Sequence, residues 1–174
     1  MLLASDTGDY SHMSNHANDP FDLQRFLDAQ EARYQHALAE LRAGQKRSHW
    51  SWYILPQVLG LGFSSMSVRY AIGSLAEAKA YLEHPVLGTR LRECVAAMNA
   101  HTGLSAVHIL GQVDAQKFRS CLTLFAQAAS SDPLFGDALT KYFAGQPDAT
   151  TLAILARQHA ARGEAHPTGS GLGG

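Results

Sequence analysis

Apolar residues recur every three or four positions along most of the chain, which is the spacing of one buried helix face. The clearest stripe comprises Leu23, Phe26, Leu27, Gln30, Tyr34, Leu38 and Leu41. It predicts one long amphipathic helix that begins at the Asp19 cap, carries Pro20 in its first turn and ends at Gly44.

Further helices are bounded by caps, glycines and prolines. They are predicted before Pro56, over 64–70, 74–84, 87–103, 114–128, 132–143 and from 148 onward, with a brief turn of helix after Ser105. Ser74 and Glu77 form a capping-box pattern, and Asp114, Asp132 and Asp148 are the other predicted caps. No run of residues alternates cleanly between apolar and polar, so no strand is predicted. Residues 50–55 are the one β-like alternative. The prediction is an all-α fold, a compact array of seven or eight helices with little or no sheet.

The ends of the chain differ from its middle. Residues 1–18 are polar and contain His12 and His16, and residues 163–174 are rich in glycine. Such segments hold a fixed backbone poorly. We therefore expect an N-terminal tail over 1–18, one helical domain over 19–162 and a flexible C-terminal tail over 163–174, within a length that suits one domain.

Charge and cysteine usage narrow the class of protein. Lys and Arg total 14 and Asp and Glu total 15, for a net charge of -1. This balance provides no broad positive field for a phosphate backbone, so no nucleic-acid partner is expected. Cys94 and Cys121 form no CxxC pair and fall on apolar stripes, which predicts buried free thiols in a reducing compartment. With no signal peptide and no membrane-spanning run, the expected location is cytoplasmic.

Motifs for metal, cofactor or nucleophilic chemistry are missing from the sequence. The nine histidines form no HExxH motif, and no GxSxG elbow, Walker-type loop or GxGxxG occurs. The prediction is no metal and no cofactor. Catalytic residues stay unassigned, and whether the chain is an enzyme stays open.

Residues 49–57 concentrate both tryptophans of the chain in one short segment. Trp50 and Trp52 lie between His49 and Gln57, with Tyr53 beside them. One interpretation is a ligand-binding wall, in which aromatic rings stack on a flat ligand and His49 and Gln57 form directed hydrogen bonds. The alternative is that the rings join several short helices in the core.

A second candidate lies on the predicted helix that follows Asp114. Lys117 and Ser120 are three residues apart and so share a helix face. They are candidate ligand-binding residues, since a polar stripe can meet phosphate or carboxylate groups. The alternative is a solvated helix face.

The same residues resemble a known family, the domain-of-unknown-function family numbered 1810. The resemblance rests on residues 46–57, 60–64, 70–72, 77–91 and 114–125. Ser51 stands where a larger apolar residue is common in the family. The resemblance implies a small, mostly helical bacterial protein of a kind sometimes mislabelled calpastatin. It implies no activity, substrate or catalytic residue.

Three functions follow as hypotheses. The first is a small-molecule pocket, for instance for a nucleotide-like ligand, around residues 49–57. The second is an N-glycosidase acting on ADP-ribose-like compounds, because residues 26–30 faintly resemble a helix of NADAR-type enzymes, although Glu31 stands where that pattern favours lysine. The third is a helical interaction module, suggested by the similar segments 84–88 and 132–136. Oligomeric state is not indicated.

Overall fold

Residues 18–164 are described by the computed structural model, and within that range the chain forms ten helices and no sheet. The seven longer helices are α1 (Gln24–Glu31), α2 (Tyr34–Ala43), α5 (Leu75–Glu83), α6 (Leu87–Asn99), α8 (Gln112–Ala128), α9 (Pro133–Phe143) and α10 (Ala149–Glu164). The three short helices are α3 (Ser51–Ile54), α4 (Ser65–Arg69) and α7 (Ala106–Leu110). The predicted all-α class is confirmed.

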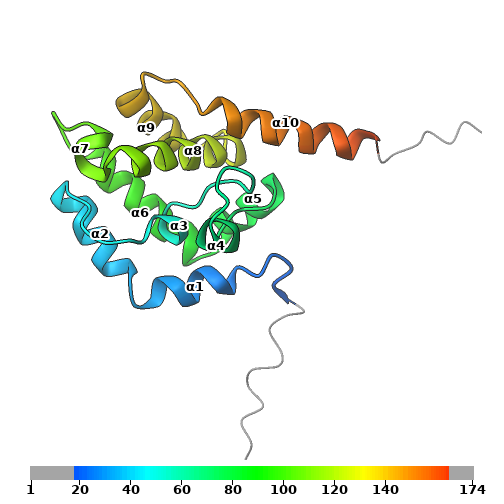
Figure 1. Cartoon of the computed structure of the whole chain (residues 1–174), viewed down its shortest axis with the longest axis horizontal. Coiled ribbons are helices and arrows are strands. Elements are labelled where there is room, and N and C mark those ends of the chain that lie inside the picture. Colours follow the sequence, from blue (N-terminus) through cyan, green and yellow to red (C-terminus); the bar gives the residue numbers. More distant parts are fainter. Residues whose placement is uncertain (1–17, 165–174) are drawn as a thin grey trace, which may run out of the picture.

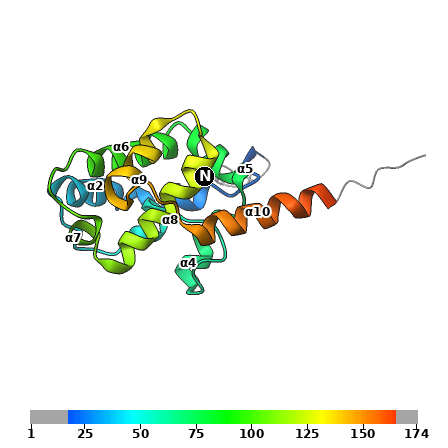
Figure 2. The same cartoon turned by 90° about the horizontal axis from the view of Figure 1, so that it is seen from above.

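Most of the two expected tails, including His12 and His16, lies outside the described residues. Helix α10 runs to Glu164 and extends away from the body of the molecule (Figures 1 and 2). Only Thr151 and Ile154 of α10 are buried, so its first turns alone pack on α8. None of the described helices is both long enough and apolar enough to cross a membrane.

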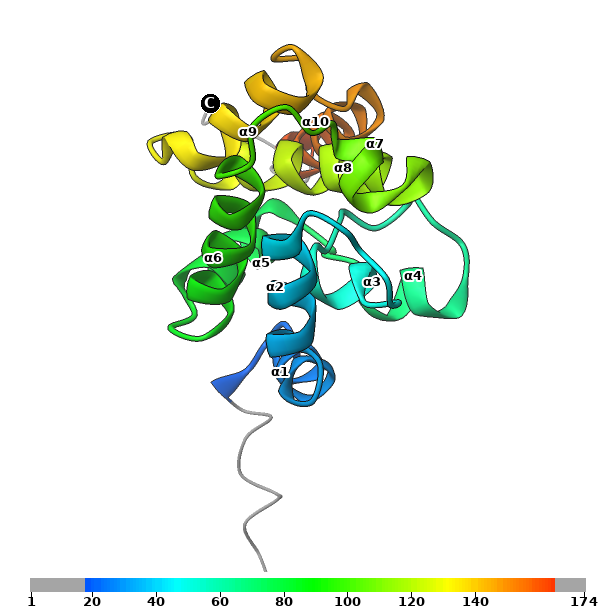
Figure 3. The same ribbon diagram turned by 90° about the vertical axis from the view of Figure 1, so that its left-hand side faces the viewer.

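Two helical hairpins form the centre of the fold. Helices α5 and α6 make the first hairpin and α8 and α9 the second, and α5 packs on α8 while α6 packs on α9. Helix α2 covers the other side of α6, which places α1 and α2 opposite α8 and α9 (Figure 3). The similar segments 84–88 and 132–136 begin the second helix of each hairpin, after His84 and Asp132 respectively.

A run of aromatic rings joins these layers. Phe26 of α1 meets Tyr81 of α5 edge-on at a centroid distance of 5.1 Å, and Tyr81 lies 5.4 Å from Phe125 of α8. Phe125 in turn lies 5.9 Å from Phe135 of α9. All four rings are buried, and such pairs add stability beyond the apolar area that they remove from water. The rings thereby join α1 and α5 to the hairpin of α8 and α9.

The long first helix of the prediction is wrong in two respects. Both carboxylate oxygens of Asp19 accept backbone N–H groups, from Leu23 at 2.8 Å and Gln24 at 3.0 Å, so the helix begins after a turn and not at Pro20. The chain then breaks between Glu31 and Tyr34. Because α1 packs on α3 and α2 packs on α6, one straight helix cannot serve both contacts.

One other helix start differs from the prediction. Asp114 does not cap its helix, because Gly111 turns the chain at φ 84° and α8 begins two residues earlier, at Gln112. The short helix predicted before Pro56 is α3, so the β-like alternative over residues 50–55 is not formed. Between residues 18 and 164 the one β-type pairing is an isolated bridge between Val58 and Ile72.

Both cysteines are buried free thiols, as predicted. Burial raises the pKa of Cys94 to about 12, and it raises the pKa of Cys121 well above the ordinary value. Neither thiol is therefore ionised at neutral pH, which removes them as candidate nucleophiles.

Candidate ligand-binding site

The segment before α3 wraps around one buried carboxylate. Glu40 of α2 accepts hydrogen bonds from the backbone N–H groups of Arg47 and Ser48, the Ser48 hydroxyl and the Trp50 indole Nε1, at 2.6 to 3.2 Å. Burial alone would raise the pKa of Glu40, but these hydrogen bonds outweigh it and lower the pKa to about 2. Trp50 is only 1% exposed, so it belongs to the core and lines no ligand wall.

The two neighbours of Trp50 that were predicted as site residues lie in different surroundings. The His49 side chain is exposed and lines none of the hollows described below. The Trp52 indole is half-buried, and the Lys117 ammonium lies 5.1 Å from the centroid of its ring. This cation–π contact joins α3 to α8 and brings two predicted site residues together.

A hollow of about 570 Å³ opens beside these two side chains, and we call it the α8 hollow. It lies among the loop after Gln57, helix α4, the first half of α8 and the start of α10. Its lining residues are Gln57, Leu61, Gly62, Ser67, Gln112, Val113, Gln116, Lys117, Ser120, Asp148 and Thr150. The structure thus gathers Gln57, Lys117 and Ser120, three of the six predicted site residues, around one space.

A small inner chamber of about 10 Å³ adjoins the α8 hollow. The two share Gln57, Ser67 and Lys117 as walls, and the chamber adds Trp52 and Ser51. Ser51 is 3% exposed, and among residues 18–164 its hydroxyl has no hydrogen-bond partner. A buried hydroxyl without a hydrogen-bond partner destabilises the fold, so a role for the Ser51 hydroxyl in binding is worth testing.

Local sequence explains how the loop comes to lie against α4. The Ser64 hydroxyl accepts the Ser67 backbone N–H at 3.1 Å and starts the helix. Gly62 faces Ser67 so closely that a Cβ atom there would lie 2.6 Å from the Ser67 hydroxyl. The backbone N–H of Leu59 donates to the Ile72 carbonyl at 2.9 Å, which ties the other end of the loop to the residues after α4. Glycine at position 62 is therefore required for this wall of the hollow.

One group of ion-paired side chains beside the hollow, formed by Lys46, Asp114 and Lys117, carries a net positive charge. The Asp114 carboxylate lies 2.9 Å from the Lys46 ammonium and 3.7 Å from the Lys117 ammonium. Two ammonium groups thus share one carboxylate, which leaves one positive charge at neutral pH. Asp148 also lines the hollow, and it accepts the Thr151 N–H and hydroxyl at the start of α10.

Sequence reasoning missed several lining residues, notably Ser51, Ser67 and Gln116. Ser67 and Gln116 lie in ordinary polar helical positions that carry no signal of their own. The departure of Ser51 from the family pattern was the one hint available. Ser120 is buried and its hydroxyl donates to the Gln116 carbonyl at 3.1 Å, so its oxygen keeps acceptor capacity toward the hollow.

In the segment behind the glycosidase hypothesis, Phe26 and Gln30 face the core. Gln30 is 1% exposed, and its amide donates to the Tyr53 carbonyl at 2.7 Å and to the Tyr81 hydroxyl at 3.1 Å. Tyr34 is likewise buried and donates its hydroxyl to Glu93. Within the described residues, no three or more His, Cys, Asp or Glu side chains are grouped so as to hold a metal ion.

The fold and the hollow define a small all-helical domain with a surface hollow whose lining includes Lys117 and Asp148. The family model for the protein of unknown function DUF1810 matches residues 20–155, and the chain belongs to that family. The crystal structure of the conserved hypothetical protein Rv1873 from Mycobacterium tuberculosis is similar, with 48% sequence identity and a TM-score of 0.78. The match covers 79% of this chain and 99% of that chain. No curated protein matches this chain.

Proposed function

We propose that this protein binds a small molecule with an anionic oxygen group, such as the phosphate of a nucleotide, in the α8 hollow. The observation that carries the proposal is the Ser51 hydroxyl, which is buried, has no partner among residues 18–164 and lines the inner chamber. A ligand oxygen placed there accepts its hydrogen bond and relieves the cost of the unmade bond.

The electrostatics of the hollow favour an anion at Lys117. Its ammonium shares Asp114 with Lys46, so the group is positive overall. Gln112 and Val113, in the first turn of α8, and Thr150, in the first turn of α10, also line the hollow. The N-terminal ends of long helices carry a partial positive charge that attracts anions.

The remaining lining groups suit a polar organic ligand. Gln57, Gln112 and Gln116 supply amides that both donate and accept hydrogen bonds, and Leu61 and Val113 supply apolar surface. A volume of about 570 Å³ falls within the usual range for small-molecule sites. Asp148 carries the opposite charge, so we expect a ligand that presents its anionic group to Lys117 and hydroxyl or amino groups to Asp148.

A thermal-shift screen of the full chain against nucleotides and sugar phosphates tests the proposal. A ligand present at 100 times its dissociation constant stabilises the fold by about 2.7 kcal/mol. For a chain of this length, that corresponds to a rise of roughly 5–10 °C in the unfolding temperature. The Lys117→Met and Ser51→Ala variants are expected to lose most of this rise, whereas Lys79→Met, at an exposed position on α5, is expected to keep it.

Tryptophan fluorescence supplies a second measurement. Trp52 lies against Lys117 and Trp50 is enclosed beside Glu40, so ligand binding is expected to change the emission of Trp52 only. In Trp52→Phe the fluorescence response is lost while Trp50 still reports that the chain is folded. The proposal is wrong if no compound raises the unfolding temperature, or if Lys117→Met and Lys79→Met respond alike.

A further inference from the structure

A second hollow lies between the start of α1, with the residues that precede it, and the end of α5. It has a volume of about 290 Å³, and we call it the α5 hollow. Its walls are largely apolar and include Phe21, Leu23, Leu27 and Ala80. Within the described part of the chain, the two hollows have no lining residue in common, so the α5 hollow is a separate candidate site.

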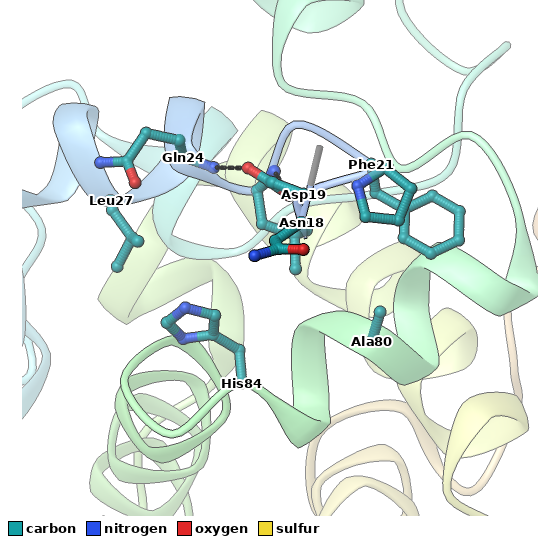
Figure 4. A pocket seen from close by; sticks show the side chains of 9 residues that line it. Asn18, Asp19, Phe21, Gln24, Leu27, Ala80 and His84 are labelled. Carbon is teal, nitrogen blue, oxygen red and sulfur yellow. Dashed lines mark hydrogen bonds between the residues drawn. The ribbon is translucent and has the colours of Figure 1, made fainter. Parts of the chain in front are cut away.

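His84 is the distinctive polar group of the α5 hollow. In Figure 4 its ring extends from the end of α5 toward Asn18 and Leu27. Its Nδ1 atom accepts the backbone N–H groups of Val86 at 3.1 Å and Leu87 at 3.2 Å, at the start of α6. A ring nitrogen that accepts hydrogen bonds carries no proton, so the neutral ring carries its proton on Nε2. The helix start therefore sets the tautomer, and Nε2–H remains as a donor for the hollow.

The other polar groups show which charge the site accepts. The two oxygens of Asp19 each accept one backbone N–H group, from Leu23 and from Gln24 (Figure 4 shows the bond to Gln24). The Gln24 amide nitrogen donates to Asp28 at 2.9 Å. Among residues 18–164, no lysine or arginine lines the α5 hollow. An anion finds no cation there, and the two N–H groups at the start of α1 offset part of the Asp19 charge that would attract a cation.

We propose that the α5 hollow is a binding site for a small uncharged molecule, a ring that carries one carbonyl or ring-nitrogen acceptor. The acceptor receives the hydrogen bond from Nε2 of His84, and the Asn18 amide lies beside it. The ring packs on Phe21, Leu27 and Ala80. The apolar lining stabilises the complex by removing the ring from water, and the one directed hydrogen bond sets its orientation.

Three matched probes test both the site and the charge preference. Benzamide, benzoate and benzylamine share a ring and differ in charge. They are titrated at millimolar concentration into the ¹⁵N-labelled full chain, and backbone amide resonances are followed by NMR. We expect benzamide to shift the resonances of Leu27, Ala80 and His84, with little response to benzoate or benzylamine. Long-range ¹H–¹⁵N spectra of the imidazole are expected to show the Nε2–H tautomer.

Variants then assign the binding to the hollow. Ala80→Leu fills the space, whereas Lys79→Leu places the same side chain at the adjacent, exposed position of α5. We expect Ala80→Leu to abolish the benzamide shifts and Lys79→Leu to keep them. His84→Asn retains an oxygen that can cap α6 but removes the Nε2 donor, so benzamide affinity is expected to fall by about three- to tenfold.

Each other outcome overturns the proposal. If benzamide shifts no resonance at the hollow, or if Ala80→Leu and Lys79→Leu bind it equally, the site does not exist as proposed. If benzoate or benzylamine binds as tightly as benzamide, the assignment of an uncharged ligand is wrong. Should His84→Asn fail to fold, the two leucine variants still decide the question.

Discussion

Two glycines at the same position of the two central hairpins are predicted to respond oppositely to alanine. Gly88 of α6 and Gly136 of α9 each follow a capping residue, His84 or Asp132, by four positions. From sequence alone the two substitutions look equivalent. We expect Gly88→Ala to destabilise the fold and Gly136→Ala to stabilise it.

The difference lies in what surrounds each Cα atom. A Cβ atom at Gly88 would lie 2.0 Å from the backbone oxygen and 2.8 Å from the carbonyl carbon of Leu82. The same oxygen accepts a hydrogen bond from Arg92 at 3.2 Å. Moving α5 away from α6 costs packing and weakens this bond. Overpacking of this kind costs about 1–3 kcal/mol, and a clash with backbone belongs at the upper end, near 3 kcal/mol.

Gly136 has open space where its Cβ atom would be, since no heavy atom lies within 4 Å. Its position is exposed and helical. Replacing a helical glycine by alanine reduces the conformational entropy of the unfolded chain and is worth about 0.5–1 kcal/mol. Thermal unfolding followed by circular dichroism measures both effects. At roughly 2–4 °C per kcal/mol, the unfolding temperature is expected to rise by about 1–4 °C for Gly136→Ala and to fall by about 6–12 °C for Gly88→Ala. Shifts of the same sign in the two variants would refute the close helix contact at Gly88.

Two further predictions concern single residues. The pKa of Glu40 is lowered from 4.5 to about 2, so its ionised form stabilises the fold above pH 4.5, and this contribution is lost as the pH falls toward 2. Glu40→Gln is expected to lower the free energy of unfolding by about 3 kcal/mol at pH 7 and by much less at pH 2, in urea denaturation at the two pH values; a pH-independent difference would contradict this. Ala144 ends α9 in the left-handed region at φ 52°, so Ala144→Gly is expected to stabilise the protein by about 0.5–1 kcal/mol. Ala156→Gly, at an exposed position inside α10, is the control and is expected to destabilise it by about 1 kcal/mol, so the reasoning fails if both variants change stability in the same direction.

Local chemistry explains why much of the helix pattern could be predicted. Ser64, Ser105 and Asp132 each accept a backbone N–H group at the start of a helix, as their residue types suggested. Gly44 ends α2 in the left-handed region at φ 74°. These signals act within a few residues, and so they can be read from a short window of sequence.

Residues with the same local sequence pattern take different roles in the structure, and the packing of distant segments decides which role each takes. Asp114 resembles a cap as much as Asp132 does, yet Lys46, far away in the chain, takes its carboxylate at 2.9 Å. Trp50 and Trp52 are the same residue type and lie only two positions apart. One is enclosed because Glu40 accepts its indole N–H, and the other faces Lys117 at the inner chamber.

The sequence by itself determined the helical class, most helix ends and the burial of both cysteines, because helical periodicity and caps are local properties. It also singled out Gln57, Lys117 and Ser120 as polar residues worth following. Only the tertiary structure decided that Gln57 and Lys117, together with Ser51, meet around one space, since they come from a loop and two helices that are separate along the chain. Contacts of that kind arise when whole helices pack, and no short stretch of residues encodes which faces will meet.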